Sequence, residues 1–170
     1  MRTAKVCIIG DFAVGKTSTV ARFAKNEFSS KYLTTVGVKI DTKEVETSDG
    51  RLKLIIWDVA GTDRLSEIEF AYLRGSAGII LVADGTRAAT VDSALRLKAD
   101  VFDQYGDLPI VAMLNKSDLS QLWEINDDVL ATSRAAGLNW THSSAKSGDN
   151  VAEAIEALAE AIMSLPADPT

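Results

Sequence analysis

The 170-residue sequence predicts an α/β fold, with a six-stranded, mostly parallel sheet that has one antiparallel strand and about five flanking helices. Strand-like and helix-like segments alternate along the chain, and two of the strand-like segments are apolar throughout. The composition, with 46% apolar and 25% charged residues, is that of a globular protein. A chain of this length forms one domain, which we expect at residues 1–165, followed by a short tail at residues 166–170.

The first half of the chain predicts three strands and a helix. A β-branched run at residues 6–10 predicts the first strand, and residues 15–24 have helical spacing. The expected inner face of that helix has four residues: Thr17, Val20, Ala21 and Phe23. Residues 38–47 and 52–58 are strand-like and are joined through Asp49-Gly50, which suits a tight hairpin because glycine accepts positive φ. These two strands should therefore be antiparallel.

Apolar runs at residues 78–83 and 110–114 predict strands that helices cover on both faces. Residues 91–105, between these runs, have helical spacing.

Two helices and a short strand complete the prediction. Residues 127–136 predict a helix with Asn126 as its N-cap and Gly137 at its end. Residues 139–142 predict a last short strand, and residues 149–164 the closing helix. The apolar side of the closing helix has five members: Val151, Ala154, Ile155, Leu158 and Ile162. Ligands of such a fold bind beyond the carboxyl ends of the strands.

Charge and composition exclude several classes of function. The net charge of −6 gives no basic surplus for nucleic acid or anionic lipid, so we expect neither as a partner. The single cysteine, Cys7, lies in an apolar run, so we expect a buried thiol, no disulfide and a cytoplasmic location. No apolar stretch approaches the ~20 residues of a membrane helix. The last six residues lack the cysteine that prenylation needs, so we expect no direct membrane anchor. We also expect a monomer.

A phosphate-binding motif follows the first strand. The segment Gly10-Asp11-Phe12-Ala13-Val14-Gly15-Lys16-Thr17 has two glycines separated by four residues, then lysine and a hydroxyl. Such a loop turns backbone N–H groups toward phosphate oxygens, and the following helix presents its positive dipole end to them. Lys16 then reaches the terminal phosphates, and the Thr17 hydroxyl ligates Mg²⁺. The sequence therefore predicts a P-loop NTPase fold.

A second motif selects the base. Asn115-Lys116-Ser117-Asp118 follows the strand at residues 110–114, and Ser144-Ala145-Lys146 follows the last strand. A carboxylate accepts hydrogen bonds from both the ring N–H and the exocyclic amine of guanine, a pair of donors that adenine lacks. Asp118 is the candidate for this role, and a backbone N–H in the second segment is the candidate donor to the guanine carbonyl.

The order of these motifs resembles that of the Ras superfamily of small GTPases over essentially the whole chain. Within it, Thr35-Val36-Gly37-Val38 and Tyr72-Leu73-Arg74-Gly75-Ser76-Ala77 are similar to Rab segments, and Trp57-Asp58-Val59-Ala60-Gly61 resembles the start of switch II. The resemblance implies that Thr35 ligates Mg²⁺ and contacts the γ-phosphate, that Asp58 holds Mg²⁺ through water, and that the Gly61 N–H contacts the γ-phosphate. It further implies that Phe28 packs beside guanine, that Tyr32 closes over the phosphates, and that the stems of Lys116 and Lys146 cover the base. Core packing is the expected role of Trp57 and Tyr72.

The resemblance thus implies GTP or GDP as ligand and Mg²⁺ as cofactor. The expected nucleotide contacts are Asp11, Phe12, Ala13, Val14, Gly15, Lys16, Thr17, Ser18, Phe28, Tyr32, Thr35, Gly61, Asn115, Lys116, Asp118, Ser144, Ala145 and Lys146. The expected catalytic residues are Lys16, Thr35, Gly61 and Thr62, and the expected metal ligands are Thr17, Thr35 and, through water, Asp58. Effectors, exchange factors and GTPase-activating proteins are the implied partners, through residues 29–38 and 59–75.

Two departures from the family fall where hydrolysis is decided. Thr62 replaces the glutamine that orients the attacking water, and its shorter side chain lacks an amide. Phe12-Ala13 replaces smaller residues, and the Phe12 ring either crowds the γ-phosphate or folds outward against switch II. We therefore expect a molecular switch with slow intrinsic hydrolysis that a partner completes. Two alternatives are a hydrolysis-deficient GTP-bound module (a pseudo-GTPase) and a P-loop kinase, which residues 115–118 oppose.

Overall fold

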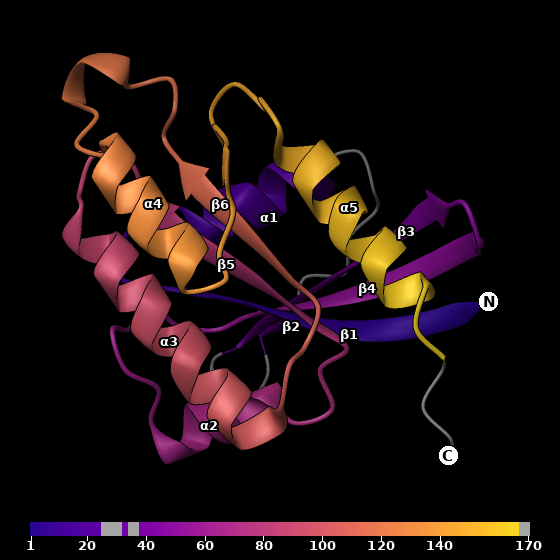
Figure 1. Cartoon of the computed structure of the whole chain (residues 1–170). Helices are drawn as coiled ribbons and strands as arrows, with labels where there is room; N and C mark the ends of the chain where they lie inside the picture. Colours follow the sequence, from indigo (N-terminus) through magenta and orange to yellow (C-terminus); the bar gives the residue numbers. More distant parts are fainter. Residues whose placement is uncertain (25–31, 34–37, 167–170) are drawn as a thin grey trace.

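A computed structural model describes residues 1–24, 32–33 and 38–166. Within these ranges a single sheet has the strand order β2-β3-β4-β1-β5-β6-β7 (Figure 1). Its strands are β1 (Arg2–Gly10), β2 (Tyr32–Leu33), β3 (Lys39–Thr47), β4 (Gly50–Asp58), β5 (Gly78–Asp84), β6 (Ile110–Asn115) and β7 (Trp140–His142). The helices are α1 (Lys16–Ala24), α2 (Glu67–Leu73), α3 (Ala89–Tyr105), α4 (Asp127–Ala135) and α5 (Val151–Met163), with a 3-10 helix η1 (Ser120–Leu122). The predicted α/β fold is confirmed, and the two-residue β2 extends the six predicted strands at one edge.

The sheet is parallel from β4 to β7, and β3 is its antiparallel strand. β1 pairs in parallel with both β4 and β5. β6 pairs in parallel with β5 on one side and with β7 on the other. β3 and β4 form the predicted hairpin, with Thr47 opposite Gly50. Gly50 has φ of +121°, the backbone conformation for which a glycine was expected at this turn.

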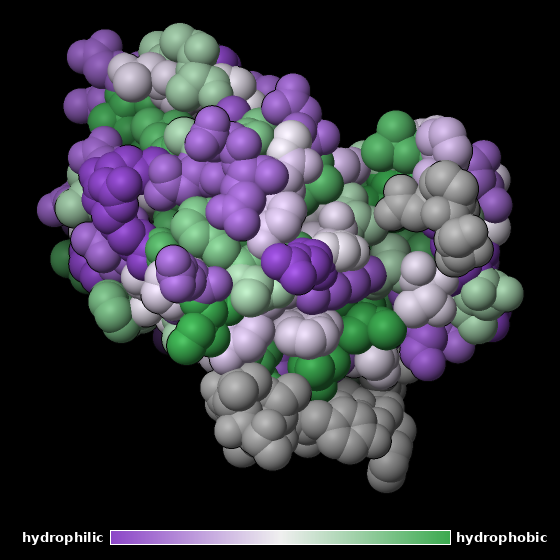
Figure 2. All heavy atoms as spheres, turned by 90° about the horizontal axis from the view of Figure 1, so that it is seen from below, coloured by the Kyte–Doolittle hydropathy of each residue, from purple (hydrophilic) through white to green (hydrophobic). Residues whose placement is uncertain are grey.

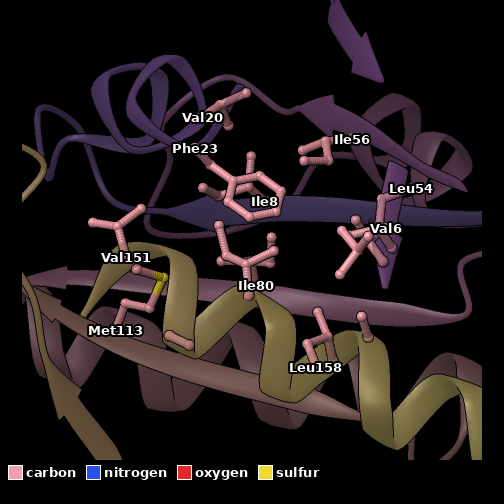
Figure 3. Packing of buried hydrophobic residues seen from close by; sticks show 14 of the residues in the cluster. Val6, Ile8, Val20, Phe23, Leu54, Ile56, Ile80, Met113, Val151 and Leu158 are labelled. Carbon is pink, nitrogen blue, oxygen red and sulfur yellow. The ribbon is translucent and has the colours of Figure 1, made fainter. Parts of the chain in front are cut away.

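Helices cover both faces of the sheet, each over its own apolar cluster. Strand β1 shows the division, because Val6 and Ile8 face one cluster while Cys7 and Ile9 face the other. The first cluster packs under α1 and α5 (Figure 3). The second packs under α2, α3 and α4. Cys7 is fully buried, as expected.

Hydrophobic residues are dispersed on the face seen in Figure 2. That face is the underside of Figure 1, and its hydrophobic areas lie between hydrophilic ones. In the described ranges, no helix is long and apolar enough to span a bilayer.

The Asn126 cap and the final helix match their predictions. Asn126 Oδ1 accepts from the Val129 amide at 2.9 Å, and Gly137 follows α4 with φ of +85°. All five residues of the expected apolar side of α5 are buried.

Three details differ from the prediction. Strand β1 begins at Arg2, because residues 2–5 pair with residues 52–55 of β4. Val20 and Phe23 are buried as predicted, but Thr17 is exposed and Ala21 only half-buried, because α1 turns Thr19 and Ala24 toward the sheet in their place. Helix α2 was missed, although its capping box is visible in the sequence as Ser66 followed three residues later by Glu69.

The topology brings the ends of five strands to one edge. The carboxyl ends of β1, β4, β5, β6 and β7 lie there because these strands are parallel. From this edge β1 leads to α1 on one face, and β5 leads to α3 on the other. A crevice forms where neighbouring connections leave to opposite faces, which makes this edge the expected ligand site.

Candidate nucleotide-binding site

The phosphate motif has two positions that only glycine fits, Gly10 at the end of β1 and Gly15 before α1. A Cβ on Gly10 would lie 2.4 Å from the Val82 carbonyl oxygen. A Cβ on Gly15 would lie 2.2 Å from Asn115 Nδ2, and Gly15 has φ of +101°. Close packing and positive φ therefore account for both glycines of the phosphate motif.

Three consecutive carbonyls of this loop accept hydrogen bonds from side chains on other segments. The pairs are Arg87 Nη2 to Phe12 O at 2.6 Å, Lys116 Nζ to Ala13 O at 3.0 Å and Asn115 Nδ2 to Val14 O at 2.9 Å. In a trans peptide the N–H points opposite to the C=O. The amides of residues 13, 14 and 15 therefore point away from these donors.

Lys16 and Thr17 start helix α1 beside a carboxylate. Lys16 is only 7% exposed, and burial lowers the pKa of its ammonium, although Asp58 and Asp11 offset part of that effect. Thr17 Oγ1 donates to Asp58 Oδ2 at 2.7 Å. A hydroxyl and a carboxylate side by side are the oxygen ligands that suit Mg²⁺, which takes few protein ligands and keeps several waters. These residues therefore fit the cation that the sequence predicts.

Gly61 lies against the phosphate loop. A Cβ at this position would be 2.9 Å from Phe12 Cα and 3.1 Å from Lys16 Nζ. The next residue, Thr62, donates its amide to the Gly10 carbonyl at 3.0 Å. The beginning of the predicted switch II thus contacts the phosphate loop directly.

The two base-recognition segments meet at a second part of the same edge. Asp118 Oδ1 accepts from Ser144 Oγ at 2.8 Å, and Asn115 Oδ1 accepts from the Ala145 amide at 3.0 Å. The Ser144 amide donates to the Asp149 carbonyl, so among the described residues the Lys146 amide is the one left as the candidate donor to the guanine carbonyl.

Three adjoining hollows connect these parts. The first, of about 290 Å³, has the following lining: Gly15, Ser18, Asn115, Lys116, Asp118, Leu119, Ala145 and Lys146. The second, of about 360 Å³, shares Gly15, Ser18 and Lys116 with the first, and also contains Ala13, Lys16 and Thr17. The third, of about 170 Å³, shares Lys16 and Thr17 with the second and adds Lys39, Asp58, Val59, Ala60 and Gly61. Together they form a trough from Asp118 to Gly61.

Some predicted site residues lie elsewhere or outside the described ranges. Phe28 and Thr35 are outside the described residues, and Tyr32 is described only as backbone in β2. The side chain of Asp11 turns away from the trough and accepts from Ser93 Oγ on α3 at 2.6 Å. Phe12 is 64% exposed.

Thr62 uses its hydroxyl within its own turn. Its Oγ1 donates to the Arg64 carbonyl at 2.6 Å and accepts from the Arg64 amide at 3.1 Å.

Trp57 and Tyr72 have the expected packing role. Both are half-buried against the second apolar cluster, with ring centroids 6.4 Å apart.

Sequence reasoning missed residues that support the trough from behind. Arg22 of α1 donates its Nε to the Ala145 carbonyl at 2.9 Å and its Nη2 to the Lys146 carbonyl, which fixes the second base segment. Asp84, whose side chain is 1% exposed, pairs with Arg87 and Lys116. A carboxylate at the end of the apolar run of β5 was the available signal for Asp84, because a buried charge needs partners.

These features define a P-loop protein with a site for a guanine nucleotide, and comparisons with known proteins agree. The sequence profile described as "Ras family" matches residues 5–164. Ras-related protein YPTC6 of Chlamydomonas reinhardtii is 37% identical over 155 residues, which are 89% of this chain and 71% of that protein. Ras-related protein Rab-7L1 of Rattus norvegicus is 35% identical over 166 residues, covering 94% and 81%. Ras-related protein RABA5a of Arabidopsis thaliana is 36% identical over 164 residues, covering 95% and 74%.

The chain belongs to the Ras family and is a Rab-like small GTPase. It is a GTP-binding switch that hydrolyses GTP, and the comparisons give no support to a hydrolysis-deficient module. Proteins of this family bind GTP or GDP and interact with effectors, exchange factors and activating proteins.

Proposed function

We propose that the trough holds GDP or GTP with Mg²⁺, the guanine at Asp118 and the terminal phosphates at Lys16. The observation that carries this proposal is the continuity of the three hollows, which join motifs more than a hundred residues apart. Asp118, fixed by Ser144, accepts from the guanine ring and amine, and the stems of Lys116 and Lys146 cover the base. Residues 1–165 form the nucleotide-binding domain, followed by a tail at residues 166–170.

The phosphates lie against the amides of residues 13–18, at the N-terminal end of α1. Alignment of these amides with the positive end of the helix dipole favours bound anions. The buried ammonium of Lys16 regains a counter-charge when phosphate binds, which offsets the cost of its burial. Thr17 and Thr35 supply direct oxygen ligands to Mg²⁺, and Asp58 holds the ion through water.

Switching depends on the third hollow. The Gly61 N–H and Thr35 contact the γ-phosphate, so hydrolysis to GDP releases both segments. Residues 29–38 and 59–75 are then the surfaces that effectors, exchange factors and activating proteins read in a cytoplasmic, monomeric protein.

Intrinsic hydrolysis is slow, and a partner completes the site. In-line attack on the γ-phosphorus needs an oriented water molecule as the bond to the leaving oxygen breaks. Thr62 is a poor group for that task because its hydroxyl both donates and accepts within its own turn. The large exposure of Phe12 favours Thr62, rather than the Phe12 ring, as the limiting residue.

A competition assay tests nucleotide recognition. Purified chain is loaded with a fluorescent GDP and challenged with GTP, GDP, ATP and ADP. We expect guanine nucleotides to displace the probe at least a hundredfold better than adenine nucleotides, because Asp118 meets two donors that adenine lacks. Asp118→Ala should abolish this preference, whereas the matched variant Asp103→Ala, on the exposed surface of α3, should keep it. Equal displacement by ATP and GTP in the wild type contradicts the proposal.

A further inference from the structure

We propose that Asp84 and Arg87 are positioning residues, which hold the phosphate loop in its nucleotide-binding conformation and couple it to the guanine motif. This inference rests on the proposed function. Neither residue lines the trough; both lie behind it, at the start of the connection from β5 to α3.

Asp84 joins two cations that each hold a carbonyl of the phosphate loop. Its Oδ2 lies 2.7 Å from Lys116 Nζ and 3.0 Å from Arg87 Nε. Lys116 donates to Ala13 O, and Arg87 donates to Phe12 O, the preceding carbonyl. One buried carboxylate therefore orients both donors to adjacent peptide groups.

The direction of these carbonyls decides where the amides point. Because each held C=O faces Asp84 and its partners, the N–H groups of residues 13 and 14 face the opposite way. Ala13 has φ of +57°, a conformation that a non-glycine residue keeps only where its surroundings impose it. The two cations are those surroundings, since each donates to a carbonyl of residue 12 or 13.

Lys116 connects this network to the base. It also has positive φ, +70°, and it lines the first hollow with Asp118. Its ammonium ends between Asp84 and the phosphate loop. A shift of Asp84 therefore reaches both the base site and the phosphate loop, whereas a shift of Arg87 reaches the phosphate loop alone.

The test compares Arg87→Gln and Asp84→Asn with exposed matched controls. Arg51→Gln and Glu46→Gln remove the two partners of a surface ion pair in the β3–β4 hairpin. We expect Arg87→Gln to raise the GDP dissociation rate about tenfold and Asp84→Asn about a hundredfold, with the controls within about twofold. Arg87→Lys should give an intermediate rate, because Arg87 uses two separate nitrogens, Nε to Asp84 and Nη2 to Phe12 O, and a lysine has only one.

Two further readouts separate positioning from a merely structural role. Arg87→Gln should leave the affinity for GMP within about twofold, because it disturbs only the amides that hold the later phosphates. The double variant Asp84→Asn/Arg87→Gln should dissociate GDP about as fast as Asp84→Asn alone, because both residues act through one network. Circular dichroism will check that each variant folds. If Asp84→Asn does not fold, Arg87→Gln still tests the proposal, because the Arg87 side chain is half-exposed.

Titration with inorganic pyrophosphate distinguishes this inference from the proposed function, because pyrophosphate needs the phosphate loop but no base site. A wild type without guanine preference, whose pyrophosphate affinity falls in Arg87→Gln, refutes the proposed function and keeps the inference. A wild type that prefers guanine, but whose GDP dissociation is unchanged in Arg87→Gln, refutes the inference. Equal losses of GMP and GDP affinity, or additive effects in the double variant, also refute it.

Discussion

The two ends of the trough are built differently. At the base and phosphate hollows, Asp84 and Asn115 are almost fully buried, and each links two or more segments. At the other end, residues 60–64 are exposed or half-buried, and among the described residues the Thr62 hydroxyl bonds only to its own turn. The fold therefore fixes the groups that bind the nucleotide, whereas another group must complete the end of the trough where hydrolysis takes place.

This difference has a physical reason. Binding needs donors that stay oriented whether or not phosphate is present, so their rear contacts must be buried and satisfied. A switch needs an end whose contacts depend on the γ-phosphate, so few of its contacts can be built into the core.

Gly15→Ala should abolish high-affinity nucleotide binding. The new methyl group would lie 2.2 Å from Asn115 Nδ2 and would break the contact between Asn115 and the Val14 carbonyl. We expect GDP affinity to fall more than a hundredfold in isothermal titration, since a broken buried hydrogen bond adds to backbone strain of ~1–3 kcal/mol. Gly106→Ala is the matched control, because Gly106, at the end of α3, has φ of +82° but nothing within 4 Å of the added carbon. If both variants lose affinity equally, strain rather than the rear contact is responsible.

The stability that Asp84 contributes at the buried end of the trough should decrease at low pH. Burial raises the pKa of Asp84, but hydrogen bonds from Lys116, Thr86 and Arg87 outweigh it and lower the pKa from 3.8 to about 2. A carboxyl whose pKa is lower in the folded state stabilises the fold above its unfolded pKa, and that contribution disappears as pH falls through the folded value. About 2 kcal/mol of stability should therefore be lost between pH 4 and pH 2.

Urea unfolding over this pH range measures the effect. Asp84→Asn should be less stable than the wild type at pH 6, and the gap should narrow toward pH 2 as the wild-type carboxyl gains its proton. Glu46→Gln, in an exposed pair, should run parallel to the wild type. A constant gap between wild type and Asp84→Asn at every pH would mean that the carboxyl charge is not what stabilises the network.

The same difference explains which parts of the fold and the site could be predicted from the sequence. Its motifs identify the groups that face a ligand, since the phosphate loop requires Gly15, Lys16 and Thr17 in a fixed order, and the strands were visible as apolar runs. The residues that hold these loops from behind follow no fixed order in the sequence. Asp84 and Arg87 lie three residues apart where β5 leads into α3, whereas Arg22 lies in α1, and only the fold brings them to the loops that they hold. Asp11 shows the converse, because it lies inside the motif but its side chain bonds to Ser93 on α3.

The smallest expected effect concerns the hydrolytic end. Single-turnover hydrolysis by the wild type should be well below the ~10⁻² s⁻¹ of a GTPase with a built-in arginine. Thr62→Gln should raise that rate several-fold, because the longer side chain leaves the local turn with Arg64 and supplies an amide that accepts from water while donating to phosphate. Phe12→Gly and Phe12→Ser should change the rate little, because the ring is largely exposed. A rate that rises in the Phe12 variants and not in Thr62→Gln would assign the barrier to crowding by the ring, and a fast wild type would remove the need for a completing partner.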